Sequence, residues 1–382
     1  MQMRTIYKNG ALLAILITLI LPSYSLLKAS EKPKQLRHCA PQDWMSAQIN
    51  RDFLPFINGS LVFHRAEQIV EDSKIQQTDP GLMRVTYQNR HLLIRNWKNQ
   101  CVNPRSDKSL FSGRLRHMHA AFCKLIKMHN LPEFDIVILL HDCEDSYPAN
   151  HGPILCFSKR MTSDHCIMIP DFEALGGNQD KLKSVQEGIH EYPWDQKKNQ
   201  AFWRGATTGG DYSLSNFLDY PRSKCVQLSL ENTTLINARF TSLCQTNDAK
   251  NIQAHFSSFF CKPIPVKAHL LYKYQITLDG NASTYSRLIW QLHSNCLVFK
   301  QSSPFQQWFY NSLIPFVHYV PFAWDVSDLK EQLLWAQNHD IEAQQIVKNA
   351  NLYGAKNFSP QSIYSYLYLV VQKHSQLEKS LQ

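Results

Sequence analysis

The sequence predicts an α/β fold in which helices cover largely parallel sheets. Its clearest unit runs from residue 272 to 300, YKYQITLDGNASTYSRLIWQLHSNCLVFK. Residues 274–278 are short, apolar and rich in β-formers, as a buried strand requires. Residues 279–282 carry turn chemistry, and residues 296–299 are typical of a second buried strand. A strand, a helix and a second strand in this order form the building block of a parallel sheet.

The helix inside this unit is predicted to begin at Ser283, because a serine hydroxyl is a good N-cap. Leu288, Ile289 and Leu292 fall on one face of that helix. The turn before it offers backbone N–H groups and the positive end of a helix, and Arg287 adds a charge. We therefore expect a phosphate at this turn. The alternative is an ordinary strand–helix–strand unit with Arg287 solvated on the surface.

Another strand is predicted at Phe134–Leu140, where the continuous apolar run indicates that both faces of the strand are covered by other elements. His141 and Asp142 follow directly. Ligands of open α/β sheets bind at the carboxyl ends of the strands, so Asp142 stands where a catalytic group is expected. The alternative is that Asp142 only starts a turn or caps the next helix.

A third strand is predicted at 201–203, and the turn Arg204–Gly210 follows it. Its small residues allow close approach of the backbone to a ligand, and Arg204 supplies charge. The turn matches neither the P-loop nor the GxGxxG pattern. A mobile surface loop is the alternative.

The other elements follow from periodicity, caps and breakers. Further strands are predicted at 85–94, 154–158, 166–169 and 225–230. Helices are predicted within 43–65, at 114–131, from Asp325 or Ser327 to 335, at 341–353 with a stop at Gly354, and from Ser359-Pro360 almost to the end. Residues 31–40 are predicted to be a polar linker and 176–200 a polar crossing between domains.

The N-terminal 30 residues are typical of an export signal. Arg4 and Lys8 precede an uncharged run at 9–27, the order of a basic and an apolar region in a secretory signal. The run is also long enough to anchor the chain in a bilayer. We therefore expect an exported or membrane-anchored protein, on the periplasmic side or in a secretory pathway, with possible membrane association through residues 9–27.

Charge and cysteines narrow the class of function. The net charge is +9 over 382 residues, which favours an anionic partner. Lys and Arg are spread along the chain rather than clustered, so no nucleic-acid partner is expected. The ten cysteines include no C-x-x-C pair, which gives little support for a zinc site. In an exported chain some of them are candidates for disulfides.

Several motifs in fixed order resemble one family. They are FWRGATTG at 202–209, PR at 221–222, YKY at 272–274, DGNAS at 279–283 with Arg287, LVFK at 297–300 and HYVP at 318–321. Together they resemble glycosyltransferase family 90, which includes capsule-associated xylosyltransferases, protein O-glucosyltransferases and bacterial lipopolysaccharide-core glycosyltransferases. The likeness extends upstream to about residue 40.

The resemblance implies a GT-B fold, in which two Rossmann-like domains face each other across a cleft and the C-terminal helix packs back. We accordingly expect four segments. They are a signal peptide or anchor at 1–30, an acceptor-side domain at 31–198, a nucleotide-sugar-binding domain at 199–358 and a C-terminal helix at 359–382.

The resemblance also implies an activity. This is inverting transfer of a sugar, of the glucose or xylose class, from a UDP-sugar to a hydroxyl of a glycan, a lipopolysaccharide core or a protein, with no metal cofactor. Asp142 falls on the position of the catalytic base. The donor-binding positions are Arg204, Gly205, Ala206, Thr207, Arg222, Asn281, Ala282, Ser283, Thr284, Tyr285, Ser286 and Arg287.

This chain departs from the animal members in two spacings. The turn before Arg287 is one residue longer, and Arg204 and Arg222 lie farther apart, as in bacterial members. The first departure leaves open which hydroxyl of the turn bonds the phosphate.

Two alternatives remain open at this point. Residues 142–145, Asp-Cys-Glu-Asp, resemble the D-x-D motif of metal-dependent glycosyltransferases. The basic turn near Arg287 argues against a metal, because it already supplies positive charge. The second alternative is an exported protein that binds a UDP-sugar or a glycan without turnover.

Overall fold

The computed structural model describes residues 41–75, 81–144, 151–176 and 179–380. The predicted export signal and polar linker therefore lie outside the described residues. No helix within the described ranges is long and apolar enough to cross a membrane.

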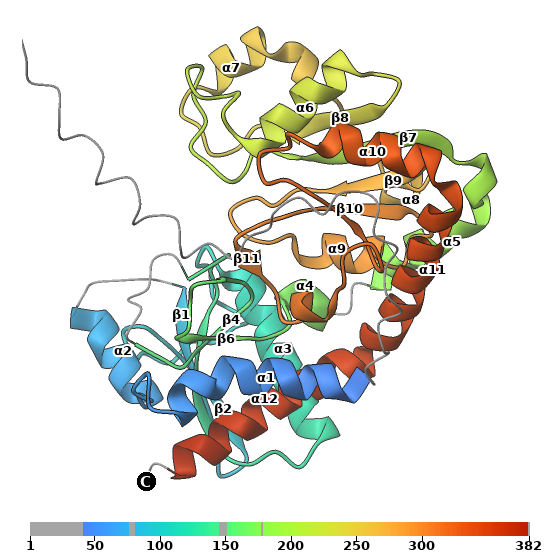
Figure 1. Cartoon of the computed structure of the whole chain (residues 1–382). Helices are drawn as coiled ribbons and strands as arrows, with labels where there is room; N and C mark the ends of the chain where they lie inside the picture. Colours follow the sequence, from blue (N-terminus) through green and yellow to red (C-terminus); the bar gives the residue numbers. More distant parts are fainter. Residues whose placement is uncertain (1–40, 76–80, 145–150, 177–178, 381–382) are drawn as a thin grey trace, which may run out of the picture. The chain divides into compact units, whose positions relative to one another are not determined.

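The described chain alternates helices and strands over most of its length (Figure 1). The α-helices are α1 Pro41–Ile57, α2 Ala66–Ile75, α3 Ser112–Met128, α4 Phe172–Leu175, α5 Gln179–Glu191, α6 Pro221–Glu231, α7 Ala249–His255, α8 Val266–His269, α9 Tyr285–Gln291, α10 Leu329–Asn338, α11 Asp340–Asn357 and α12 Pro360–Ser380. Short 3-10 helices are η1 Trp194–Gln196, η2 Ser257–Phe259 and η3 Tyr310–Ser312. The strands are β1 Leu82–Gln88, β2 His91–Asn96, β3 Phe134–Leu139, β4 Ile154–Cys156, β5 Lys159–Arg160, β6 Cys166–Met168, β7 Lys198–Ala206, β8 Ile236–Ser242, β9 Tyr272–Thr277, β10 Leu297–Gln301, β11 Phe305–Gln306 and β12 Val320–Phe322.

The first sheet has the order β2-β1-β3-β4-β6 and is mixed. Strand β3 pairs antiparallel with β1 and parallel with β4. This central place explains the buried apolar run at 136–139, which follows Asp135 in this strand. Residues 85–94 were predicted as one strand and form a hairpin instead. Asn89 and Arg90 turn the chain in the left-handed region, with φ of 50° and 65°, and such a turn joins antiparallel strands.

The second sheet has the order β12-β10-β9-β7-β8, and every pairing in it is parallel. The predicted unit at 272–300 is confirmed as β9, α9 and β10. Strands β7 and β9 are neighbours, so the turns that follow them meet at one edge of the sheet. The α/β fold with parallel sheets is therefore confirmed.

The stretch 225–230 was predicted as a strand and is the body of helix α6. Pro221 stands in the first turn of that helix, where a missing N–H costs nothing. The buried side chains Cys225, Val226 and Ser229 recur at three- and four-residue spacing, which is the helical period. Strand β8, which follows this helix and pairs with β7 at the edge of the second sheet, was not predicted. The polar stretch 176–200 likewise contains a helix, α5.

Two predicted helix signals near the C-terminus are wrong, and a third is confirmed. Helix α11 continues through Gly354, where a side chain would lie 3.0 Å from the carbonyl oxygen of Leu292. The glycine thus permits close packing and does not end the helix. Helix α10 has Asp328 at its N-cap, not Asp325 or Ser327. Ser359 begins α12 as predicted, and its Oγ accepts a hydrogen bond from the N–H of Ser362 at 3.1 Å.

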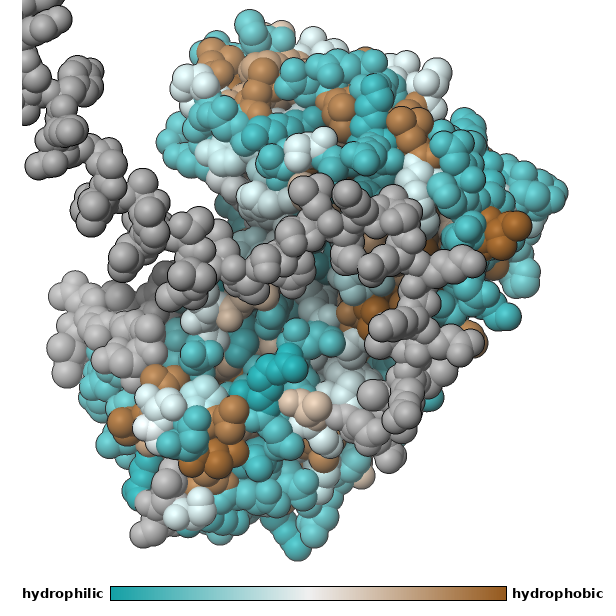
Figure 2. All heavy atoms as spheres, in the orientation of Figure 1, coloured by the Kyte–Doolittle hydropathy of each residue, from teal (hydrophilic) through white to brown (hydrophobic). Residues whose placement is uncertain are grey.

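Each sheet has its own hydrophobic core. Helices α1 and α12 pack on the first sheet, where Tyr366, Leu367 and Val370 are fully buried. Figure 1 shows α12 running beside α1. The second core surrounds Trp203 and Phe240. On the face drawn in Figure 2, hydrophilic residues predominate and the hydrophobic ones form small separate patches. The domain boundaries at 30, 198 and 358 stay predictions.

The nine described cysteines, which exclude Cys39, form no disulfide with one another. The disulfides that export makes possible are thus absent among the described residues.

The first core contains a buried ion pair between Lys159 and Asp52. Nζ of Lys159 lies 2.8 Å from Oδ1 of Asp52, whose Oδ2 accepts the N–H of Met168 at 3.0 Å. Burial by itself lowers the pKa of Lys159, but Asp52 outweighs it and the pKa is raised.

We predict that Lys159→Met destabilises the protein by about 3–5 kcal/mol, because it leaves the Asp52 carboxylate buried without its cation. Urea unfolding followed by circular dichroism measures the effect. Lys183→Met, at an exposed position of α5, is the matched control. Equal midpoints for the two variants would contradict the prediction.

Candidate active site

A cavity of about 490 Å³ lies where the turns after β7 and β9 meet the end of β3. Its walls come from the segment after β3, from α4 and α5, from both turns and from α9. The lining residues are Asp142, Glu173, Lys181, Arg204, Gly205, Thr208, Arg222, Thr241, Pro263, Ile264, Val266, His269, Gly280, Asn281, Ala282, Ser283, Thr284, Tyr285, Ser286, Arg287 and Trp290.

The turn after β9 folds tightly because Asp279 and Gly280 fix it. The buried Asp279 carboxylate accepts the N–H of Thr284 at 3.2 Å, and the N–H of Gly280 donates to the carbonyl of Ala282 at 3.0 Å. A side chain at Gly280 would collide with the Thr208 hydroxyl and the Arg222 guanidinium. Glycine is therefore required where the two turns touch.

Helix α9 begins at Tyr285 with Thr284 at the N-cap, one residue after the predicted cap Ser283. Ser283 does not cap it, because its hydroxyl donates to Oγ of Ser158 at 2.8 Å. No side chain caps this helix. The predicted cap is therefore wrong, although the predicted turn is present.

Arg222 connects the two turns through backbone carbonyls. Its Nη1 donates to Ala206 at 2.7 Å, its Nε to Asp279 at 2.8 Å and its Nη2 to Leu278 at 3.2 Å. Nη2 of Arg287 donates to the carbonyl of Arg204 at 2.8 Å. All these acceptors are neutral, so the positive charges are not cancelled by them.

The third arginine of the cavity, Arg204, turns toward β8. Its Nη2 donates to Oδ1 of Asn237 at 2.8 Å, and its guanidinium lies 4.2 Å from the Phe202 ring centre. Within the described ranges, none of Arg204, Arg222 and Arg287 forms an ion pair with a carboxylate. Three arginines without a carboxylate partner among the described residues thus line one cavity.

The pKa shifts show how costly this arrangement is. Burial, followed by repulsion from Arg222, lowers the pKa of Arg287 from 12.5 to about 10. Burial, followed by repulsion from Arg287 and Arg204, lowers the pKa of His269 to about 3. His269 is therefore neutral at pH 7 while the arginines stay charged. A buried anion would relieve the repulsion, which makes the cavity a candidate anion site.

One wall beside the arginines is apolar. Pro263, Ile264 and Val266 line it with Trp290, and the neutral His269 ring meets the Trp290 ring edge-on at 5.6 Å. A cavity that joins fixed cations to an apolar wall can hold a ligand with a phosphate end and a planar apolar end.

Asp142 faces this candidate anion site from the end of β3. Its Oδ1 accepts Nη2 of Arg114 at 2.6 Å and the Tyr285 hydroxyl at 3.1 Å, and its Oδ2 accepts Nδ2 of Asn281 at 3.0 Å. Burial by itself raises the pKa of Asp142, but Arg114, Asn281 and Tyr285 outweigh it and lower the pKa. Asp142 is thus an ionised, fixed carboxylate at neutral pH.

A second carboxylate, Glu173, also lines the cavity. It bonds the hydroxyl of Ser286 and accepts Nζ of Lys181 at 3.0 Å. Nζ of Lys181 also donates to Ser286 at 2.7 Å. Ser286, which was predicted to bind the sugar donor, is therefore held by side chains of α4 and α5.

The structure brings together most of the predicted site residues. Asp142, Arg204, Gly205, Arg222 and the whole run Asn281–Arg287 line the cavity. Ala206 and Thr207 do not line it. Ala206 offers its carbonyl to Arg222, and the buried Thr207 hydroxyl exchanges two hydrogen bonds with the backbone of Cys244.

Sequence reasoning missed Arg114, Glu173, Lys181, His269 and Trp290. Arg114 lies on α3, far from Asp142 in sequence, and no local motif marks it. Glu173 had one usable signal. It follows Asp171, which caps α4 through the N–H groups of Glu173 and Ala174, just after a predicted strand.

The comparisons now decide the family. Residues 89–381, more than half of the chain, match the family described as glycosyl transferase family 90. The chain belongs to this family. The resemblance predicted from the motifs is confirmed.

Relatives in this family are protein O-glucosyltransferases by name. Protein O-glucosyltransferase 2 of Danio rerio is 29% identical over 271 residues, which are 68% of this chain and 51% of the relative. Protein O-glucosyltransferase 3 of Homo sapiens is 27% identical over 364 residues, 89% of this chain and 65% of the relative. The chain thus spans between about half and two thirds of the length of these relatives.

One solved structure is also similar. It is the crystal structure of a glycosyltransferase from Rickettsia africae ESF-5, with 10% identity and a TM-score of 0.33 over 71% of this chain and 83% of that one. A likeness at this score carries no argument.

The metal-dependent D-x-D alternative concerns the carboxylates of Asp142, Glu144 and Asp145. Glu144 is buried and bonds the N–H of Arg160 at 2.6 Å and the hydroxyl of Ser163, while Asp142 bonds Arg114. The two carboxylates therefore serve different partners. Asp145 lies outside the described residues, among which no cluster of three His, Cys, Asp or Glu residues suits a metal.

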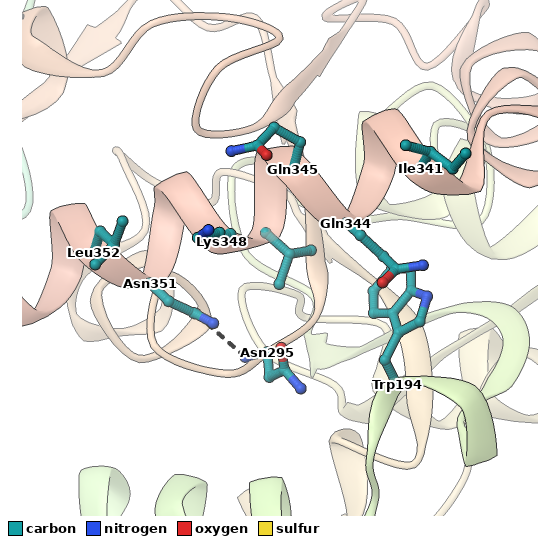
Figure 3. Close-up of a pocket in the computed structure, with 9 residues that line it drawn as sticks. Trp194, Asn295, Ile341, Gln344, Gln345, Lys348, Asn351 and Leu352 are labelled. Carbon is teal, nitrogen blue, oxygen red and sulfur yellow. Dashed lines mark hydrogen bonds between the residues drawn. The ribbon is translucent and has the colours of Figure 1, made fainter.

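A second cavity, of about 540 Å³, lies along α11 beside Trp194 (Figure 3). Gln344, Gln345 and Lys348 line it, and Asn295 donates its N–H to Oδ1 of Asn351 at 3.3 Å. None of the predicted site residues belongs to it. It also lacks the arginine cluster of the first cavity.

The carboxyl group of Asp171, at the N-cap of α4, is expected to make the stability of the protein depend on pH. It is fully buried, its Oδ1 accepts two backbone N–H groups at 2.9 and 3.1 Å, and its Oδ2 has no partner within the described structure. Burial raises the pKa of Asp171 from 3.8 to about 7. A raised carboxyl pKa contributes stability below pH 4 that is lost as pH rises to 7.

We predict that Asp171→Asn removes this loss, because asparagine keeps the helix cap without titrating. Stability relative to the wild type should therefore improve from pH 5 to pH 8, as measured by urea unfolding at both pH values. Asp180→Asn, at an exposed position of α5, is the control. A difference that stays constant between pH 5 and pH 8 would show that Asp171 does not titrate in this range.

Proposed function

We propose that this protein is an inverting glycosyltransferase. It transfers a sugar of the glucose or xylose class from a UDP-sugar to an acceptor hydroxyl. The observation that carries the proposal is the first cavity, where Asp142 faces a turn and three arginines that form no ion pair among the described residues. Membership of glycosyl transferase family 90 supports it.

The donor fits this cavity by its chemistry. The diphosphate lies against Arg287, Arg222 and the backbone of the turn after β9, since guanidinium groups match phosphate oxygens. The uracil lies along the wall of Pro263 and Trp290 beside neutral His269. This wall gives a reason for a nucleotide rather than a simple phosphate.

Asp142 acts as the general base in the transfer. The acceptor oxygen attacks the anomeric carbon from the face opposite the diphosphate and passes its proton to Asp142. The bond from the anomeric carbon to the diphosphate breaks, and UDP leaves with the electron pair. Arg287 and Arg222 stabilise the growing negative charge without reorganising.

No divalent metal is needed under this proposal. The arginines supply the positive charge that a metal supplies elsewhere. The two described carboxylates of the D-x-D stretch, Asp142 and Glu144, bond different partners.

The finer features of fold, acceptor and location belong to the same proposal. We propose a GT-B arrangement, with the parallel second sheet as the nucleotide-binding domain and the first sheet as the acceptor side. The names of the relatives favour glucose as the sugar and a protein hydroxyl as the acceptor, ahead of a glycan or lipopolysaccharide core. The apolar run at 9–27 supports export or membrane anchoring.

We predict that the protein releases UDP from one UDP-sugar of a panel and that Asp142→Asn lowers this rate about 10²–10⁴-fold, because asparagine cannot accept the proton. Each assay is run with an acceptor mixture and repeated in EDTA. Undiminished release in EDTA is expected.

Three outcomes would count against this prediction. Release that disappears in EDTA would establish a metal requirement, and release untouched by Asp142→Asn would exclude Asp142 as the base. UDP binding without release from any donor or acceptor would favour a protein that binds a UDP-sugar or a glycan without turnover.

We predict that Arg287→Gln weakens UDP binding about 10–100-fold, the range of a hydrogen bond to a charged group. Uridine affinity should change little, because uridine lacks the phosphates. Calorimetric titration with both ligands measures this, with exposed Arg116→Ala on α3 as control. Equal losses for UDP and uridine would mean that Arg287 does not bind the diphosphate.

A further inference from the structure

The Asp142 carboxylate has an open hydrogen-bonding position. A carboxylate oxygen accepts about two hydrogen bonds. Oδ1 accepts Arg114 at 2.6 Å and lies 3.1 Å from the Tyr285 hydroxyl, whose single proton is shared with the carbonyl oxygen of Asp142 at 2.9 Å. Oδ2 accepts Asn281 at 3.0 Å and no other donor of the described residues. Oδ2 therefore has a position open to a further donor.

Asn281 bonds Asp142 with one end of its amide and the turn after β7 with the other. Its Oδ1 accepts the N–H of Gly209 at 2.9 Å. Gly209 has φ of +95°, and a side chain there would lie 2.8 Å from the carbonyl oxygen of Gly280. One exposed side chain thus joins both turns of the cavity to Asp142.

Arg114 fixes Asp142 from the side of α3. Its Nη1 donates to the carbonyl of Leu140 at 2.6 Å, and its guanidinium lies 4.8 Å from the Phe172 ring centre. This anchoring to backbone and ring leaves the guanidinium little freedom. Asp142 is therefore held at Oδ1 by Arg114 and Tyr285 and at Oδ2 by Asn281.

We propose that Asn281 is a positioning residue that ties the donor-binding turns to Asp142 and leaves one position of Oδ2 for the acceptor hydroxyl. This inference rests on the proposed function and adds the direction of acceptor approach. The acceptor hydroxyl donates its proton at the open position of Oδ2. Its oxygen bonds the anomeric carbon while the bond to UDP breaks, and the electron pair passes to the diphosphate.

The same contacts set the charge state of Asp142. Arg114, Asn281 and Tyr285 stabilise the ionised form, so removing one of them raises the pKa of Asp142. Other titratable or charged groups of the cavity and its immediate surroundings act on it in every variant. They are Glu173, Lys181, Arg204, Arg222, Arg287, His269, Asp171, His141, Cys143 and Glu144.

The kinetic test uses Asn281→Ala. Its kcat for sugar transfer should fall about 10–100-fold, the range of a hydrogen bond to a charged group. The acidic limb of kcat/KM should shift to higher pH, since the base then titrates at higher pH. Asn281 is exposed on a turn, so the variant should fold. The control variant Arg116→Ala, at an exposed position of α3, should keep the wild-type kcat and the wild-type acidic limb of kcat/KM.

A ligand-free test follows the Asp142 carboxyl itself. The protein is labelled with 13C-aspartate, and Asp142→Asn identifies the signal. The titration midpoint should rise in Asn281→Ala and in Arg114→Gln and stay unchanged in Arg116→Ala. This readout needs neither donor nor acceptor.

The two tests separate this inference from the proposed function. An active enzyme whose Asn281→Ala variant keeps the wild-type kcat and acidic limb overturns the positioning role and leaves the proposed function standing. If the wild type transfers no sugar but the Asp142 midpoint rises in Asn281→Ala, the proposed function fails and the contact stands. An unchanged midpoint overturns the inference in either case.

Discussion

The candidate site depends on the buried guanidinium of Arg222. Three backbone carbonyls from two turns converge on it, from Ala206, Leu278 and Asp279. Each carbonyl brings only a partial charge, so the cation is solvated by the protein without being neutralised. The two turns are thereby held together at the edge of the second sheet, and Gly280 lets them touch. The shape of the cavity and its positive charge come from the same interaction.

The buried positive charges of this cavity lower the stability of the fold. Burial and mutual repulsion lower the pKa of Arg287 and of His269, which means that the cavity holds positive charge at a cost. Proteins tolerate such costs at binding sites, where the ligand removes them. Across the cavity, Asp142 is arranged differently, with a cation and two neutral donors around its carboxylate. The cavity thus combines arginines that have no carboxylate partner among the described residues with a stabilised negative charge on Asp142.

Two of the errors of the sequence-based predictions have a common cause. Residues 225–230 are rich in β-formers, but they follow Pro221, which stands in the first turn of α6. The buried side chains of this segment recur at helical spacing, and the segment is a helix. Gly354 has the sequence features of a helix stop, yet α11 continues because the glycine packs on the carbonyl of Leu292. Ser283 has the features of an N-cap, yet Ser158 binds its hydroxyl. For Gly354 and Ser283 a contact from outside the segment overrode the local preference.

The sequence alone determined the α/β class, the parallel unit at 272–300 and the family, because periodicity, turn residues and ordered motifs are local properties. It also pointed to Asp142 and Arg287 as candidates, since each follows a recognisable strand. Only the tertiary structure decided that Arg114 from α3 and Asn281 from the turn after β9 meet at Asp142. It likewise decided that Glu173 and Lys181 hold Ser286. These contacts join segments up to 139 residues apart, and the packing of the two sheets, not any local pattern, brings them together.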